Sequence, residues 1–337
     1  MIMSFQLCLT LRTHRKFSTC LKLLSLISTL VLFTACTVNN TPKLILNDHP
    51  LVDKIWDIKN KRFISRSSLK ASMLASEFIL LGERHDNLIH HRYQSWVIEQ
   101  LSNANKKTGV AFEMINVQQG QLLARHKVRT VDEMIGLLNQ FKTHWYYEQR
   151  YRNLFAATLQ AGFPVIPANL SRKQLRQLST KGENGLPKAY RKMLEQVPLS
   201  SLQTQSLEKE IMASHCNMLS NKIASKLVLS QRIRDAVMAH GLSKIHSPVK
   251  VLIAGAGHVR KDRGVPLYLM KYKPQARVLS LGFTEVENSS HKIADYTRRW
   301  AAEELPFDYV WFTPQVKRKD LCAEFARQMK NKHRTQN

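Results

Sequence analysis

The strongest constraint on the fold is the alternation of short apolar runs with segments of helical composition. The strand-like runs are residues 77–82, 108–114, 163–169, 249–255, 276–283 and 308–313. Helical segments lie between most of them, such as the one that follows Asn87, a residue type that caps helices. Strands separated by helices form a parallel sheet with helices on both faces. The sequence therefore predicts a three-layer α/β fold with a mainly parallel central sheet.

A long helical stretch, residues 171–242, interrupts this alternation and is predicted to be an insertion that covers one edge of the sheet. Residues 37–75 are polar and irregular, which suggests a tether and a leading element. The α/β domain is expected to span residues 76–314, and residues 315–337 form a basic C-terminal tail.

Polar and ionisable residues gather where the predicted strands end. They follow the first, second, third and fourth strands, and they are Glu83, His85, Glu113, Asn169, His258 and Arg260. The carboxyl ends of parallel strands meet at one rim of the sheet, which is where open α/β sheets bind ligands. We therefore expect these side chains to form one polar constellation.

Two chemistries suit the constellation. Glu83, His85, Glu113 and His258 could bind a divalent metal ion and leave a coordination position open. Alternatively, His85 or His258 could act as a general base that Glu83 or Glu113 orients. A third interpretation makes the carboxylates buried partners of Arg84 or Arg260 that hold the loops in place. The residues alone leave these alternatives open.

Two glycines follow the fourth predicted strand. Gly255 and Gly257 flank a turn, for which the sequence predicts positive φ and close approach of the backbone. The third glycine of a dinucleotide-binding fingerprint is missing, so a nicotinamide site is not expected.

Histidine, tyrosine and arginine residues near the same rim suit haem. His91 follows the first strand, and Tyr146 and Tyr147 lie in the aromatic segment His144-Trp145-Tyr146-Tyr147. Both residue types serve as axial ligands of haem iron. Arg84 and Arg260 could pair with the propionates. The aromatic segment could equally be part of the core.

The chain has a large excess of positive charge. It contains 51 Lys and Arg against 25 Asp and Glu, a formal net charge of +26. Such a charge attracts nucleic acid, anionic lipid or acidic small molecules. The sequence carries no zinc-finger spacing, RNA-binding signature or helix-turn-helix pattern, so nucleic acid is not the expected partner. A membrane surface or an anionic ligand is the better interpretation, and a general basic bias of the organism's proteins is the alternative.

The N-terminal sequence predicts a secretory signal peptide. Basic residues precede an apolar run, residues 23–35, that is too short for a comfortable transmembrane helix. The run ends in Phe33-Thr34-Ala35-Cys36, which matches a bacterial lipobox with lipidation of Cys36. Residues 1–36 are thus predicted to be a lipoprotein signal, and the mature chain a lipid-anchored protein of the outer membrane that faces the periplasm. Ordinary cleavage near Ala35 is the alternative.

The chain has five cysteines. With Cys36 lipidated and the signal removed, Cys216 and Cys322 remain, and no CxxC pair indicates a zinc or thioredoxin-like site. In an oxidising compartment these two cysteines are candidates for a disulfide.

A set of ordered motifs carries a family resemblance. The motifs are GERHDNLIHH (82–91), VAFEM (110–114), HWYY (144–147) followed by Tyr151, VIPANLSR (165–172), IRDAVMAH (233–240), GAGHVRKDRGVP (255–266) and DYVWFT (308–313). In this combination, over residues 76–314, the sequence resembles the ChaN-like haem-binding uptake family of the Tiki superfamily.

The resemblance implies an EreA/ChaN-like fold, a role in haem or iron acquisition, and haem bound at a homodimer interface. It also implies kinship with Tiki, TraB and erythromycin-esterase-like proteins, whose histidine and glutamate motifs serve hydrolysis; here those positions are Gly82, His85, Glu113 and His258. None of the motifs fixes the axial ligand, so Tyr146, Tyr147 and His91 all remain candidates. The leading hypothesis is an envelope haem-binding lipoprotein, and the alternative is a hydrolase that uses Glu83, His85, Glu113 and His258.

Overall fold

The structure is a computed structural model that describes residues 42–300, 302–320, 322–324 and 327. The chain divides into residues 1–40 and a compact unit of residues 41–337. The predicted signal and Cys36 lie outside the described residues. Among the described residues, no helix combines the length and the apolar composition needed to cross a membrane. Because residues 41–337 form a compact unit by themselves, a chain that begins at residue 41 is expected to fold without the preceding segment.

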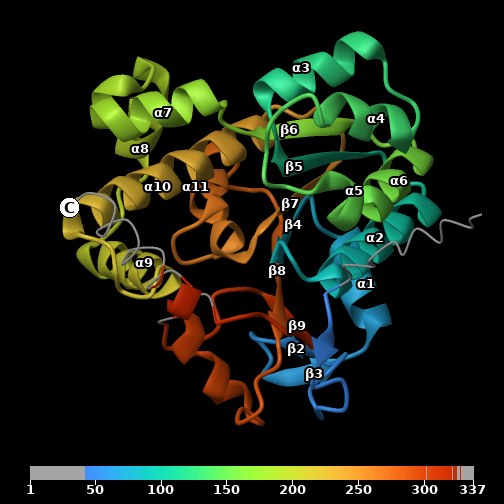
Figure 1. The fold of residues 1–337 in the computed structure, drawn as a ribbon. Coiled ribbons are helices and arrows are strands. Elements are labelled where there is room, and N and C mark those ends of the chain that lie inside the picture. Colours follow the sequence, from blue (N-terminus) through green and yellow to red (C-terminus); the bar gives the residue numbers. More distant parts are fainter. Residues whose placement is uncertain (1–41, 301, 321, 325–326, 328–337) are drawn as a thin grey trace, which may run out of the picture. The chain divides into compact units, whose positions relative to one another are not determined.

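An eight-stranded sheet forms the centre of this unit, in the order β3-β2-β9-β8-β4-β7-β5-β6. Its strands are β2 (Ile55–Asp57), β3 (Arg62–Ile64), β4 (Phe78–Glu83), β5 (Thr108–Asn116), β6 (Val165–Asn169), β7 (Val249–Gly255), β8 (Val278–Glu285) and β9 (Tyr309–Thr313). The strands from β9 to β6 run parallel, and β2 pairs antiparallel with both β9 and β3. The predicted three-layer α/β class with a mainly parallel sheet is confirmed (Figure 1).

Helices cover both faces of the sheet, on the right and the left in Figure 1. One group comprises α1 (Arg66–Leu74), α2 (Leu88–Asn103), α3 (Val117–His126), α4 (Val131–Leu138), α5 (Tyr147–Arg150) and α6 (Arg152–Gln160). The other includes α10 (Asn221–Ser243) and α11 (Val265–Tyr272). Successive strand residues point to opposite faces, so Ile79 and Leu81 of β4 pack with the first group and Leu80 with the second. The sheet therefore has two hydrophobic cores, one on each face.

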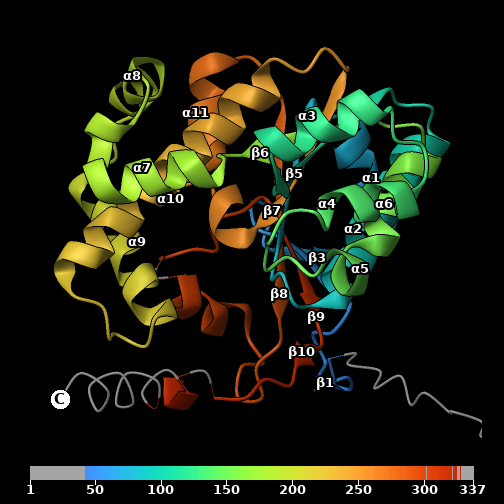
Figure 2. The same cartoon turned by 45° about the horizontal axis from the view of Figure 1, so that its top comes forward.

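The predicted insertion, residues 171–242, contains four helices. They are α7 (Arg172–Lys181), α8 (Lys188–Gln196), α9 (Ser201–Ser214) and α10, with a short 3-10 turn η1 (Gly182–Gly185) after α7. Ser171 and Ser200 cap α7 and α9 with capping boxes, which explains breaks that the apolar periodicity alone does not show. In Figure 2, as in Figure 1, α3 and α7 lie at the β6 side of the sheet.

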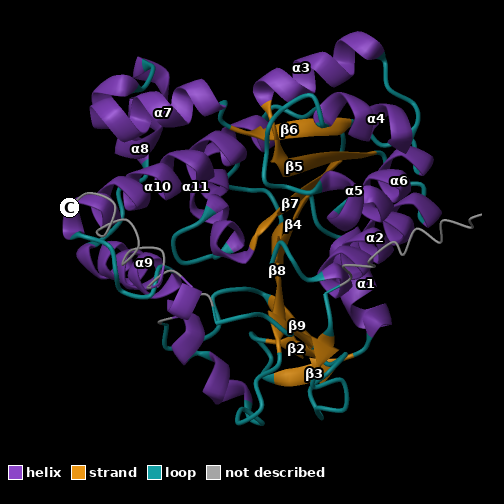
Figure 3. Cartoon of the chain, viewed as in Figure 1, coloured by secondary structure: helices purple, strands orange, loops and turns teal. Residues whose placement is uncertain are grey.

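Several short elements lie outside the predicted ones. β1 (Leu44–Ile45) pairs with β10 (Gln315–Val316), and β2, β3 and α1 occupy residues that the sequence assigned to a leading element. Residues 55–74 thus belong to the sheet and to the helices around it (Figure 3). The remaining turns are η2 (Ala256–Val259), η3 (Ile293–Tyr296) and η4 (Arg298–Trp300).

A disulfide joins Cys216 to Cys322, with the two Cα atoms 5.5 Å apart. Cys216 lies between α9 and α10, and Cys322 follows β10. The bond therefore connects the helical insertion to the C-terminal segment, as the candidate pairing from the sequence required.

Candidate functional site

The polar residues that follow the strands converge at the carboxyl end of the sheet. The His85 Nδ1 lies 2.8 Å from the Oε1 of Glu83, and its Nε2 lies 3.8 Å from the Oε2 of Glu113. On the far side of Glu113, the Nε2 of His258 lies 3.3 Å from Oε1. The amide of Asn169 donates to the backbone carbonyl of Glu113 at 3.0 Å. The structure thus brings together the expected constellation, except for Arg260.

Glu83 is surrounded by hydrogen-bond donors from the α2 and α5–α6 side. The Tyr151 hydroxyl donates to Oε1 at 2.7 Å, and the Nε2 of His91 makes an ion-pair contact of 3.2 Å with Oε2. The Nδ1 of His91 donates to the backbone carbonyl of Arg150 at 2.8 Å. Burial alone would raise the pKa of Glu83, but the charges of His91 and His85 and their hydrogen bonds lower it below its ordinary value. Glu83 is therefore a buried carboxylate.

Glu113 has a different set of partners. Its Oε2 accepts from the backbone N–H of Gly255 at 2.8 Å, and its Oε1 accepts from the Arg234 guanidinium. Burial would raise the pKa of Glu113, but the charges of His258 and Arg234 hold it well below the ordinary value. A fixed guanidinium and a backbone amide therefore keep Glu113 ionised.

His258 lies between two carboxylates. Its Nδ1 hydrogen-bonds Asp235 of α10 at 2.5 Å, while its Nε2 faces Glu113. Burial would lower the pKa of His258, but the charges of Glu113 and Asp235 raise it to about 9. Burial raises the pKa of Asp235 to about 6, and the charge of His258 opposes that rise. The arrangement favours an imidazolium at position 258 in neutral solution.

His85 is the accessible member of the constellation. Its side chain is 32% exposed, whereas those of Glu83, Glu113 and His258 are 5% exposed or less. The edge of the His85 ring meets the Trp145 ring, with centroids 4.9 Å apart. Burial would lower the pKa of His85, but the charges of Glu113 and Glu83 raise it overall. A ligand that reaches this rim would meet His85 first.

Three further residues contribute to the site: Tyr151, which the sequence grouped with the aromatic haem-ligand segment, and Arg234 and Asp235, to which it assigned no role. Gln231 shares a helix face with the last two, because positions i, i+3 and i+4 lie side by side; its side-chain amide lies 3.0 Å from the Nδ1 of His258. Three polar residues at that spacing, on a helix that also buries Ile233 and Ala236, could have predicted from the sequence that α10 contributes to the site.

The glycine prediction is half right. Gly255 has φ of −56°, so its backbone is not in the left-handed region. A Cβ at this position would nevertheless lie 3.0 Å from the Nε2 of His85. Gly255 is therefore required for close approach of the His85 ring and not for backbone conformation.

The metal interpretation of Glu83, His85, Glu113 and His258 is not supported. Within the described residues, no group of three or more His, Cys, Asp or Glu side chains is arranged to hold a metal ion. The physical reason is that Arg234 and the Gly255 amide occupy the Glu113 carboxylate, while Tyr151 and two imidazoles occupy that of Glu83.

Three of the five haem candidates are buried and already bonded within the protein. His91 is 3% exposed, and Tyr147 is 1% exposed with its hydroxyl donating to the Met114 carbonyl. The Arg260 side chain is fully buried and donates to Glu210, Asp262 and the Trp300 carbonyl. These side chains would have to leave their partners to reach a ligand.

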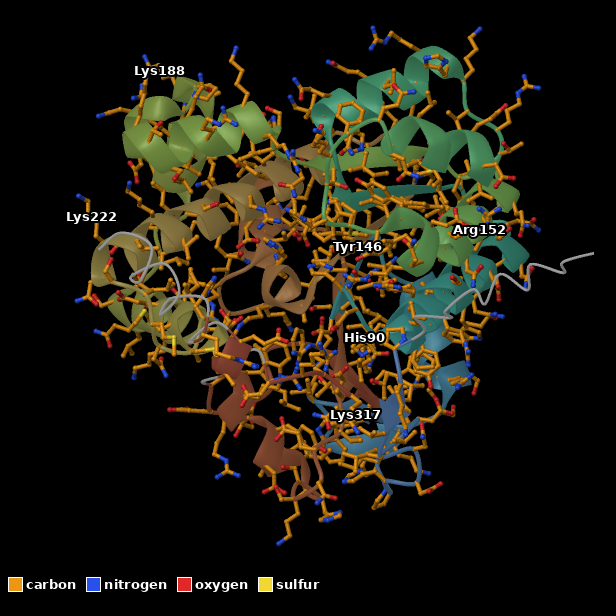
Figure 4. The ribbon with its side chains drawn as sticks, in the orientation of Figure 1. His90, Tyr146, Arg152, Lys188, Lys222 and Lys317 are labelled. Atoms are coloured by element: carbon orange, nitrogen blue, oxygen red, sulfur yellow. A yellow bond between two sulfur atoms is a disulfide. The ribbon has the colours of Figure 1, made fainter. Side chains whose placement is uncertain are left out.

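The other two haem candidates are accessible. Tyr146 is 56% exposed, and the Arg84 side chain is 41% exposed. Figure 4 labels Tyr146 in the region between the two groups of helices, above His90. His90 itself is buried, and burial lowers its pKa to about 3, so it stays neutral. Its Nδ1 accepts a hydrogen bond from the backbone N–H of Arg84 at 2.9 Å.

Comparison with known proteins places these observations in a family. Residues 69–269, more than half of the 337-residue chain, match the profile of the family described as haem-binding uptake, Tiki superfamily, ChaN. A search of curated proteins found no match.

One solved structure has a similar fold. The chain is similar to ChaN of Campylobacter jejuni, a protein that was solved with cofacially bound haem. The two sequences are 23% identical, the TM-score is 0.60, and the match covers 76% of this chain and 95% of that one. A mutant of the erythromycin esterase EreC in its open conformation has 11% identity and a TM-score of 0.44, and the match covers 76% of this chain and 95% of that one. The second similarity is too low to argue a shared activity. On the family match, the chain belongs to the ChaN family of haem-binding uptake proteins in the Tiki superfamily.

Proposed function

We propose that this chain binds haem for uptake in the cell envelope, with Tyr146 as the axial ligand of the iron. Family membership supports haem as the ligand. The observation that carries the residue assignment is the exposure of the Tyr146 phenol, since the other two axial candidates, His91 and Tyr147, are buried. Phenolate oxygen is an established haem ligand.

The backbone at Tyr146 is unusual for an aromatic residue. Its φ of 52° and ψ of 55° lie in the left-handed region, just before α5. Such conformations cost about 1–3 kcal/mol and persist where the surrounding structure holds them, often at binding sites. At Tyr146 this strained backbone carries an aromatic side chain that is exposed to solvent. This supports a ligand-facing role for Tyr146.

The buried polar network fixes the segment around Tyr146. The Trp145 ring packs against His85 and, at 6.5 Å between centroids, against Tyr151. The carbonyl of Arg150, at the end of α5, accepts from His91. Both ends of the segment are therefore held by side chains that also contact Glu83. In this proposal the buried members of the network, Glu83, His91 and Tyr151, position the ligand-binding segment and do not touch haem.

Cationic groups suit the haem propionates. The Arg150 guanidinium lies over the Tyr146 ring, 4.8 Å from its centroid. The half-exposed Arg84 contacts Asp86 at 3.8 Å and Glu285 at 3.5 Å, distances that leave its guanidinium loosely paired. Bound haem would supply the iron that the Tyr146 phenolate ligates. Arg150 and Arg84 would pair with the propionate carboxylates of the haem.

The envelope location, the anchor at Cys36 and a homodimer are parts of this proposal. The Cys216–Cys322 disulfide supports an oxidising compartment. Exchange of Cys36 for Ala should move the full chain from the membrane fraction to the soluble periplasmic fraction. If the variant stays with the membrane, the anchor assignment is wrong. Size-exclusion chromatography with and without haemin tests the dimer.

A haemin titration of residues 41–337 tests the central claim. We expect a saturable, red-shifted Soret band that Tyr146→Phe abolishes or shifts to the spectrum of a different ligand. Tyr190→Phe, which changes a half-buried tyrosine of α8, should leave the band unchanged. A flat difference spectrum in the parent chain would overturn haem binding, and an unchanged spectrum in Tyr146→Phe would overturn the ligand assignment.

A further inference from the structure

A cleft lies at the β6 edge of the sheet, and none of the five haem candidates lines it. It has a volume of about 510 Å³ and lies between α3, α4, the end of α6 and the start of β6. Its apolar lining includes Leu123, Met134, Leu159, Phe163 and Val165. This volume falls in the range of ligand-sized clefts. The name edge cleft is used for it below.

The charged residues of the edge cleft all have one sign. Lys127 and Arg129 line it, and among the described residues that line it none is acidic. Two acidic side chains lie at the start of the following helix, α4: Asp132 pairs with Arg152, and Glu133 accepts from the backbone N–H groups of Arg129 and Thr130. An apolar cleft with two cationic side chains is complementary to an acyl chain that ends in an anionic head group.

The surface around the edge cleft is also cationic. Arg125 and His126 precede Lys127 and are exposed. Across β6 lie α7 and α8, here called the basic spur, whose exposed cationic side chains are Arg172, Lys173, Arg176, Lys181, Lys188 and Lys192. Figure 4 labels Lys188 at the outer end of this spur. Among the described ion pairs, none includes a residue of the spur.

We propose that the edge cleft takes one acyl chain of an anionic phospholipid, and that the basic spur rests on the neighbouring head groups of the same bilayer. A free fatty acid would use the cleft, Lys127 and Arg129, but it would leave the spur without a partner. A bilayer surface uses both, because each basic side chain near an anionic surface adds to the affinity. Nucleic acid would use the charges and leave the apolar lining without a role.

Soluble short-chain lipids test the cleft by itself. Residues 41–337 are titrated calorimetrically with dioctanoylphosphatidylglycerol, dioctanoylphosphatidylcholine and octanoate, each below its micelle concentration. We expect saturable binding of the phosphatidylglycerol, at least tenfold tighter than that of the other two. Equal binding of phosphatidylcholine, or no saturable binding, would overturn the proposal. Tighter binding of octanoate would assign the cleft to free fatty acids and overturn the phospholipid claim.

Two variants with matched controls locate the binding. Ala124→Trp fills the cleft from the exposed side of α3, and Lys127→Gln with Arg129→Gln removes its charges. Each should weaken phosphatidylglycerol binding at least tenfold. Ala71→Trp on the exposed side of α1, and Lys59→Gln with Arg62→Gln near β3, should change it less than twofold. Unchanged binding in Ala124→Trp would overturn the assignment to the cleft, even if the charge variant binds weakly.

Vesicle flotation tests the spur. Arg176, Lys181, Lys188 and Lys192 are changed together to Gln, and Lys54, Lys59, Lys61 and Arg62 serve as the control set. The spur variant should bind phosphatidylglycerol–phosphatidylcholine vesicles at least tenfold more weakly and bind the short-chain lipid normally. Equal loss in the control set would show a general charge effect and overturn the role of the spur. Haemin binding should be unchanged in all variants; its loss in Ala124→Trp would assign the cleft to haem and overturn the lipid claim.

Discussion

The two buried carboxylates at the strand ends, Glu83 and Glu113, are stabilised by different partners. Glu83 and Glu113 are each 2% exposed, and they lie on opposite sides of His85. Glu83 is held by a phenol and two imidazoles, whereas Glu113 is held by a guanidinium, a backbone amide and the imidazole of His258. Burying a charge is costly unless it is paired and hydrogen-bonded.

The difference lies in which partners can change charge. An arginine stays protonated in proteins, so Glu113 keeps one cationic partner at any ordinary pH. Glu83 has no arginine partner: it is held by the Tyr151 hydroxyl and by the imidazoles of His85 and His91. The Glu113 side is therefore a fixed support, while the Glu83 side, which also holds the Tyr146 segment through Tyr151 and His91, is the half that can respond to conditions or to a ligand.

The largest expected effect comes from exchanging each carboxylate for its amide. Glu113→Gln leaves Arg234 without its anion and His258 with Asp235 alone, and should cost about 3 kcal/mol, the lower end for breaking a buried ion pair. Glu83→Gln can still accept from Tyr151, so its cost should be about 1–2 kcal/mol. Urea unfolding at pH 7 measures both free energies of unfolding. A cost for Glu83→Gln that equals or exceeds that of Glu113→Gln would refute the distinction.

The disulfide links the two halves, which gives a second test. Cys216 precedes α10, which supplies Arg234, and Cys322 follows Arg318, whose guanidinium donates to both oxygens of Asp86 beside His85. The bond closes a loop with a sequence separation of 106 residues. Exchange of both cysteines for Ser should lower the free energy of unfolding by about 2–4 kcal/mol. An unchanged stability, with the bond shown to be present in the parent by mass spectrometry, would contradict this.

Much of this arrangement follows from the sequence, and the reason is the topology. β4 is apolar up to its last residue, Glu83, and β7 is apolar apart from Lys250 and ends in Gly255, so the position of Glu83, His85 and His258 at one rim is predictable. β2 and β3, with three residues each, were not predicted, because such short strands carry too little alternation to be recognised.

Partners across long sequence distances were harder to predict. Arg260 has the sequence position of a rim residue, yet its side chain is buried beneath α9 with Glu210. The direction of a side chain in a loop depends on what packs there, and strand order does not give it. For the same reason the sequence could not distinguish the buried Tyr147 from the exposed Tyr146, one residue away.

The pH dependence sharpens the comparison. The folded pKa of His258 lies at about 9, above its ordinary value of 6.5, so its stabilising contribution is complete below pH 6.5 and is lost as the pH rises through 9. His85 shifts in the same direction. Asp235, whose pKa is raised to about 6, titrates mainly below pH 6.5 and adds little to this change.

The parent chain should thus lose roughly 2–3 kcal/mol of stability between pH 6.5 and pH 9. His258→Gln should remove most of that loss, leaving the part due to His85. Urea unfolding at the two pH values measures it for both proteins. If the variant and the parent lose the same stability, the imidazolium of His258 does not support Glu113.

The smallest expected effect concerns the group between the two carboxylates. Gly255→Ala would place a Cβ 3.0 Å from the His85 Nε2 without disturbing a backbone φ of −56°. Because the His85 side chain is 32% exposed, it can move outward, so the cost should be only about 1 kcal/mol. The ring would carry Trp145 with it, since the two side chains are in contact, and the Tyr146 segment should shift. A change in Trp145 fluorescence together with weaker haemin binding would show that His85 positions this segment. A Gly255→Ala protein with parental fluorescence and haemin affinity would show that the Tyr146 segment is held by Tyr151 and His91 alone.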